Sequence, residues 1–195
     1  VLGRFARAHP KVRIEARVAR NTDLLERIDS NELDLAMVWG NGGQLTSGQR
    51  PGRSSELIAE PAMCWIGSAT LPWRANADEP LPLVAFDRPC MFFSAATAEL
   101  DRRRIAWRVA FTSPGLSGLL AAAAAGLGLT VRTRYGLPAS VSVLDTRSIG
   151  LPTLPSLPLT LVRASAVGTP TVDRLASIMP ECVRGESAST DRIAA

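Results

Sequence analysis

The first forty residues change hydrophobic period three times. Apolar positions spaced for one face of a helix lead up to Ala8, and strict polar–apolar alternation follows over residues 12–18. A second helical pattern contains Leu24 and Leu25, and the apolar run that ends at Trp39 predicts another strand. Helix, strand, helix and strand in this order form the repeating unit of a parallel α/β sheet. Because the pattern opens on a helix, we expect the strand that should precede it to be missing.

The same alternation resumes in the second half of the chain. Ser113 can cap a helix there, Pro114 suits its first position, and Gly126 suits its end. The run 159–163 predicts a strand that returns to the first lobe, and a final helix follows over residues 170–182. The other predicted elements are strands over 83–86, 107–111 and 127–131 and a helix over 92–106. We therefore predict lobe one from residues 1–68 with 162–184, lobe two from residues 69–161, and a disordered tail over 185–195.

Composition supports a globular chain with a sizeable core. The chain has 195 residues, of which 46% are hydrophobic, and this suits one large or two small domains. No apolar run approaches the ~18 residues that span a bilayer, and the opening helix is amphipathic, unlike a signal peptide. We expect a cytoplasmic protein with no membrane association. Cys64, Cys90 and Cys182 have no CxxC spacing, so neither a disulfide framework nor a zinc site is predicted.

The net charge of +4 does not by itself indicate nucleic-acid binding. The arginines are spread over a helix and a strand near the start, and those at 102–104 lie beside acidic residues. No helix-turn-helix, aromatic-interleaved basic run or zinc-finger spacing accompanies them. We expect these charges on solvated faces or in a subunit interface.

Apolar and turn positions recur along the chain in a distinctive order and spacing. They are Leu2, Phe5, His9, Pro10, Val12, Ile14, Leu24, Leu25, residues 32–36 and residues 125–131. In this order and spacing, the chain resembles the effector-binding domain of LysR-type transcriptional regulators. Asn31 stands where that family usually has Gly, and it tolerates a left-handed turn nearly as well. Residues 132–135 stand where the family often has Pro after a strand.

This resemblance implies an α/β fold of two Rossmann-like lobes joined by two crossover strands, similar to type II periplasmic binding proteins. It also implies a domain that senses a small-molecule effector and pairs into homodimers or tetramers. DNA would be bound only through an N-terminal domain that is absent from this chain. The resemblance implies no cofactor and no metal.

Ligands of open α/β sheets bind at the carboxyl ends of strands, where helix N-termini favour anions. We therefore predict a small anion, most simply a carboxylate, in a cleft between the lobes. Simpler roles remain open, because Thr22 and Ser113 can be plain helix caps and Arg88 can pair with Asp87. A redox role for Cys90 is disfavoured, since only Arg88 is positioned to activate it. The candidate site residues are Asn21, Thr22, Trp39, Asp87, Arg88, Thr112, Ser113 and Thr130.

The residues give little support for catalysis. The chain has one histidine, and we find no metal-ligand spacing, no G-x-S-x-G and no paired acids on a predicted site loop. We therefore expect a binding protein and not an enzyme. A solute-binding protein of a transport system and a small α/β enzyme on the same scaffold remain as alternatives, because fold alone does not separate them.

Overall fold

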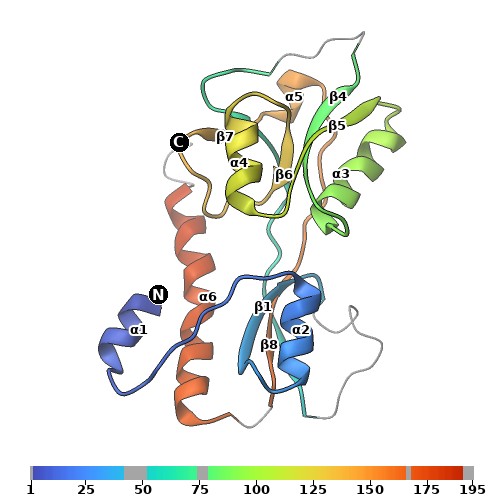
Figure 1. The fold of residues 1–195 in the computed structure, drawn as a ribbon. Helices are drawn as coiled ribbons and strands as arrows, with labels where there is room; N and C mark the ends of the chain where they lie inside the picture. Colours follow the sequence, from blue (N-terminus) through green and yellow to red (C-terminus); the bar gives the residue numbers. More distant parts are fainter. Residues whose placement is uncertain (1, 42–51, 74–78, 166–167, 191–195) are drawn as a thin grey trace. The chain divides into compact units, whose positions relative to one another are not determined.

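The computed structural model describes residues 2–41, 52–73, 79–165 and 168–190 (Figure 1). The chain divides into two compact units. Unit 1 comprises residues 1–60 and 157–195, and unit 2 comprises residues 61–156. Unit 2 is thus inserted into unit 1, and the chain passes from one unit to the other twice.

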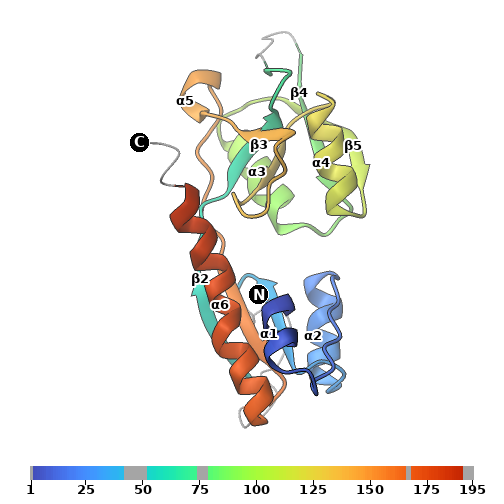
Figure 2. The ribbon, with the colours of Figure 1, turned by 90° about the vertical axis from the view of Figure 1, so that its left-hand side faces the viewer.

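Unit 1 contains an antiparallel sheet whose central strand comes from the end of the chain. The order is β1 (Leu35–Trp39), β8 (Leu159–Arg163) and β2 (Ser54–Ala59). The parallel sheet predicted for the first lobe is wrong for these strands, because β8 enters between β1 and β2 and runs opposite to both. Figure 2 shows the last helix alongside β2. The helices of unit 1 are α1 (Leu2–Ala8), α2 (Asn21–Asp29) and α6 (Pro170–Thr190).

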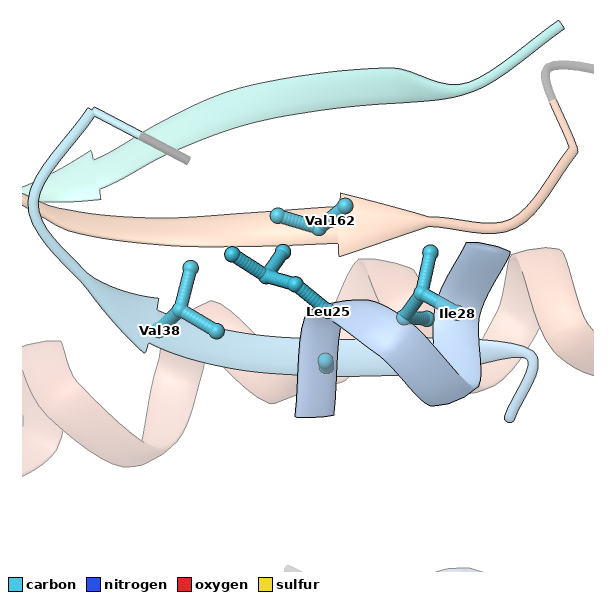
Figure 3. Close-up of a cluster of buried hydrophobic side chains, with 5 residues drawn as sticks. Leu25, Ile28, Val38 and Val162 are labelled. Atoms are coloured by element: carbon cyan, nitrogen blue, oxygen red, sulfur yellow. The ribbon is translucent and has the colours of Figure 1, made fainter. Parts of the chain in front are cut away.

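The core of this sheet is formed where α2 packs on β1 and β8. Leu25 and Ile28 lie three residues apart and share one face of the helix, while Ala36 and Val38 alternate onto one face of β1. Figure 3 shows the two helical side chains facing Val38 and Val162. All five side chains are at most 4% exposed. Burial of each large side chain stabilises the fold by roughly 1.5–3 kcal/mol.

The alternating segment 12–18 is not a strand, which corrects the sequence-based prediction. Val18 is fully exposed. Within the described residues, β1 is hydrogen-bonded only to β8, and no strand pairs with segment 12–18. A strand needs a neighbour for its backbone N–H and C=O groups, so alternation alone does not produce one. The left-handed turn expected at Asn31 is confirmed by its φ of 58°.

Unit 2 has a parallel pair and an antiparallel triplet of strands. β4 (Leu81–Phe86) runs parallel to β5 (Trp107–Ser113), and β3 (Cys64–Ser68) lies between β6 (Thr130–Arg132) and β7 (Val141–Val143). One parallel bridge, from Leu83 to Leu129, joins β4 to β6. The helices are α3 (Met91–Arg102), α4 (Leu116–Ala124) and α5 (Thr146–Ile149).

The close backbone approach expected at the glycine before β6 is confirmed. The N–H of Leu129 donates to Pro82 O over 2.9 Å, and the N–H of Val84 donates to Leu129 O over 2.8 Å. A Cβ atom on Gly128 would lie 2.5 Å from Pro82 O. Only glycine fits at this position without moving backbone, and this is what allows β6 to reach β4.

Three element boundaries differ from the sequence-based prediction. Strand β3 belongs to unit 2 and not to the first lobe, because it pairs with β6 and β7. Helix α6 continues to Thr190, so residues 185–190 are helical, while 191–195 lie outside the described residues. Helix α4 begins at Leu116 with Gly115 as its N-cap, because Ser113 is still part of β5. None of the helices described is long and apolar enough to span a bilayer.

Candidate functional site

In unit 1, the structure brings two predicted site residues together. Asn21 begins α2 and Trp39 ends β1. The Nδ2 of Asn21 donates to Trp39 O over 2.7 Å, and the N–H of Trp39 donates to Oδ1 of Asn21 over 3.2 Å. One side-chain amide therefore serves both backbone groups of the residue at the strand end. Asn21 joins the N-terminus of α2 to the carboxyl end of β1.

Thr22 is placed differently from its neighbour. It is exposed, and its hydroxyl donates to Asp23 Oδ1 over 3.2 Å. It does not cap α2, because the N-cap residue is Arg20 and no side chain makes a cap hydrogen bond there. The Thr22 hydroxyl is accessible to a ligand, whereas both ends of the Asn21 amide are already engaged.

In unit 2, the carboxyl ends of β4 and β5 lie side by side. Phe86 is paired with Ser113 in the parallel register, and Ala85 is paired with Thr112. The N–H of Asp87 donates to Ser113 O over 3.3 Å. Asp87 and Ser113, two predicted site residues 26 positions apart in sequence, thus meet at one sheet edge. Helix α3 follows β4 in the chain, and α4 follows β5.

Ser113 shapes the loop at that edge. Its side chain is 6% exposed, its hydroxyl donates to Gly115 O over 2.9 Å, and it accepts from the N–H of Gly115 over 3.2 Å. The hydroxyl therefore holds the turn that leads into α4 and is not the N-cap. Thr112 beside it is exposed.

Arg88 is also exposed, and it lies against an aromatic ring. Its guanidinium carbon is 5.2 Å from the centroid of Phe93, a buried residue on α3. Thr130 is 3% exposed and lines a small hollow together with Phe86, Cys90 and Arg132. Thr130 and Arg132 are two residues apart on β6 and therefore lie on the same side of that strand.

Arg132 is a candidate site residue that the sequence-based prediction did not include. Its guanidinium carbon lies 4.2 Å from the Phe86 centroid and 4.7 Å from the Phe92 centroid. Its Nη1 donates to Cys90 Sγ over 3.9 Å. The signal available in the sequence was a charged residue placed directly after the apolar run 127–131.

Burial changes the electrostatics of this arginine. It lowers the pKa of the Arg132 guanidinium below its ordinary value, and the adjacent Cys90 offsets part of that effect. An arginine nevertheless keeps its charge in a protein. The hollow therefore contains a desolvated positive charge. No group of three or more His, Cys, Asp or Glu side chains in the described parts of the chain is arranged to hold a metal ion.

Comparison with known sequences identifies related regulators. A family model described as the LysR substrate binding domain matches residues 1–181. The transcriptional regulator DgdR of Burkholderia cepacia is 31% identical over 158 residues, which are 81% of this chain and 49% of DgdR. PecT of Dickeya dadantii is 27% identical over 155 residues, which are 80% of this chain and 46% of PecT. The chain thus spans about half the length of these curated relatives.

Solved structures show the same fold at low identity. Vibrio fischeri DarR in complex with DNA matches with a TM-score of 0.70 and 12% identity, covering 93% of this chain and 63% of DarR. The regulatory domain of CcmR from Synechocystis PCC6803, in complex with 2-PG, matches with a TM-score of 0.65 and 14% identity, covering 92% of this chain and 88% of that domain. The predicted fold class, an α/β fold like that of type II periplasmic binding proteins, is confirmed.

Proposed function

This chain belongs to the LysR family of transcriptional regulators as its effector-binding domain, and from that premise we propose that it senses a small anion, most simply a carboxylate. The observation that carries the ligand class is the shared sheet edge of unit 2. β4 and β5 are parallel, end at Phe86 and Ser113, and are followed by α3 and α4. The amino ends of helices offer unpaired N–H groups and partial positive charge, which favour an anion.

The proposed ligand contacts differ in whether their polar side-chain groups are exposed or already hydrogen-bonded to the backbone. The hydroxyls of Thr22 and Thr112 and the guanidinium of Arg88 are accessible for direct contact. Asn21 and Ser113 act mainly by positioning, because their side chains hold the backbone of Trp39 and of Gly115. The remaining proposed contacts are Trp39, Asp87 and Thr130.

In the longer protein, we propose that an N-terminal domain binds DNA and that the protein acts as a dimer or tetramer in the cytoplasm. An effector that binds one arrangement of the subunits more tightly shifts the population toward that arrangement. DarR was solved in complex with DNA, and the regulatory domain of CcmR was solved in complex with 2-PG. These two complexes support the proposal that one domain binds DNA and another binds the effector. The relatives are regulators, and this supports a binding role over catalysis or transport.

A thermal-shift screen tests the ligand class. Small carboxylates and aromatic acids are compared with their neutral amides, each at the same concentration. A ligand at 100 times its Kd stabilises the folded domain by about 2.7 kcal/mol, so the Tm should rise with the acid and not with the amide. Stabilisation by sugars or cations alone would contradict the anion proposal. Turnover of any acid in the same samples would revive the enzyme alternative.

A further inference from the structure

Arg132 occupies an unusual position for a charged residue. It ends β6, and its guanidinium lies over the ring of Phe86 at the end of β4 and over the ring of Phe92 in the first turn of α3. The planar group contacts aromatic faces on two different elements, which is a favourable cation–π arrangement. The rings hold the guanidinium in place without neutralising its charge.

The hydrogen-bonding capacity of this guanidinium is largely unused. Nη1 donates to a thiol sulfur, Cys90 Sγ, which is a weak acceptor. Nε is fully buried and has no hydrogen-bond partner. Among the described residues, Arg132 forms no ion pair with a carboxylate, although five other arginines do: Arg17, Arg27, Arg53, Arg102 and Arg163. A buried N–H left unpaired costs free energy, which an incoming acceptor can recover.

The space beside Arg132 limits what such an acceptor can be. The hollow is lined mainly by apolar side chains, with Cys90, Thr130 and Arg132 among them, and its free volume of about 10 Å³ is what one water-sized group occupies. A carboxylate oxygen is of this size, whereas a ring or a sugar is not. Because a desolvated cation attracts an anion more strongly than an exposed one does, the hollow favours a compact negative head group.

We propose that Arg132 binds the carboxylate head group of the effector in this hollow. The proposal rests on the proposed function, and it names the residue in unit 2 that recognises the negative charge. One oxygen of a carboxylate fits this space and can accept from the buried Nε–H, which the rigid guanidinium fork holds at a fixed angle. Thr130, two residues earlier on β6, lines the same hollow and provides a hydroxyl beside the head group.

NMR spectroscopy of the unmodified chain provides the first test, with acetate as the probe and acetamide as its neutral control. Arginine Nε–Hε groups give their own cross-peaks, and Arg132→Lys identifies the one that belongs to Arg132. We expect acetate to shift this cross-peak and the amide cross-peaks of Cys90 and Thr130, with saturation, while acetamide leaves them in place. If the Arg132 cross-peak does not respond to acetate, or responds equally to acetamide, the proposal is overturned.

Paired variants provide the second test. Arg132→Met and Arg134→Met remove the same charge two residues apart, and Arg134 is exposed, so nonspecific effects of charge are matched. We expect acetate affinity to fall at least about tenfold in Arg132→Met, the loss of one charge-assisted hydrogen bond, and to be unchanged in Arg134→Met. A purely structural clamp predicts a lower Tm in Arg132→Met with unchanged acetate affinity, and that result would overturn the proposal. If Arg132→Met does not fold, Arg132→Lys is measured in the same way, since it keeps the charge and loses the fork.

The results also separate this proposal from the proposed function. If an acid binds the wild type and Arg132→Met equally well but binds Arg88→Met poorly, Arg88 recognises the anion and only the role of Arg132 is wrong. If acetate shifts the Arg132 cross-peak but no larger acid raises the Tm more than acetate does, Arg132 binds an anion and the proposed effector class is wrong.

Discussion

A Cβ atom added at Gly118 would lie 2.6 Å from the hydroxyl oxygen of Ser113. Gly118 lies in the first turn of α4, and Ser113 ends β5. Glycine costs about 1 kcal/mol relative to alanine inside a helix, so its presence there requires a reason. That reason is the buried Ser113 hydroxyl, which occupies the space beside the helix and holds Gly115.

This relationship predicts that Gly118→Ala and Ser113→Ala are coupled. Alone, Gly118→Ala should destabilise unit 2, because the new methyl group displaces the hydroxyl from Gly115. In the Ser113→Ala background, the same change should be neutral or stabilising by up to about 1 kcal/mol, because the clash is gone and helix propensity remains. Urea unfolding of the two single variants and the double variant measures the coupling. Additive effects would contradict the steric explanation.

The hydrogen bonds of the Asn21 amide predict that substitutions at Asn21 and at the adjacent Thr22 have very different effects on the free energy of unfolding. Asn21→Ala removes both hydrogen bonds to Trp39 and should lower the free energy of unfolding by about 1–3 kcal/mol. Thr22→Ala removes only an exposed contact with Asp23 and should change it by less than about 0.5 kcal/mol. Urea unfolding of the two variants compares them directly. Equal effects would show that the Asn21 pair adds nothing to stability.

The close contact at Gly128 predicts that one added methyl group there strongly lowers the stability of the fold. Gly128→Ala would place Cβ 2.5 Å from the backbone oxygen of Pro82, and backbone atoms do not move aside at low cost. We expect Gly128→Ala to lower the free energy of unfolding by about 2 kcal/mol or more. Gly115→Ala is the matched control, because a Cβ there meets no atom within 4 Å. A Tm for Gly128→Ala equal to that of the control would contradict the close approach.

Two ion pairs of α2 predict different contributions to stability. Nη1 of Arg53 lies 3.2 Å from Asp29 Oδ1, and the two side chains are 5% and 15% exposed. Nη1 of Arg27 lies 2.5 Å from Glu32 Oε2, and those side chains are 37% and 56% exposed. Arg53→Met should lower the free energy of unfolding by about 3 kcal/mol, because it removes a counter-ion from the largely buried Asp29, whereas Arg27→Met should lower it by less than about 1 kcal/mol. Chemical denaturation at low and moderate salt checks both, and a smaller loss in Arg53→Met would contradict the prediction.

Much of the fold could be predicted from the spacing of hydrophobic residues, because this spacing is set within each helix or strand. Strand β8 was predicted with its observed bounds, since an apolar run of β-branched residues and leucines is buried on both faces. Segment 12–18 shows the limit of that reasoning. Its alternation suits a strand, yet pairing depends on a neighbour, and a neighbour is not encoded in the segment itself.

The candidate site could be predicted only in part, for a related reason. Strand ends and helix starts indicated the sheet edge at Ser113 and Asp87, which the structure places together. Periodicity did not indicate Arg132, because its distinguishing property is the set of side chains around it. Phe86, Cys90 and Phe92 lie about forty residues earlier in the sequence and reach Arg132 only through folding.

The central place of β8 in the sheet of unit 1 has a consequence for synthesis of the chain. A ribosome makes residues 1–60 before unit 2, but these residues lack β8, the strand to which both β1 and β2 are hydrogen-bonded. Unit 2, residues 61–156, is continuous in sequence and has its own core. It can therefore fold while β1 and β2 are still unpaired. Unit 1 becomes complete only after residue 163 has emerged. Its closure joins segments about 100 residues apart, and a slow step of this kind leaves β1 and β2 open to chaperones and proteases in the interval.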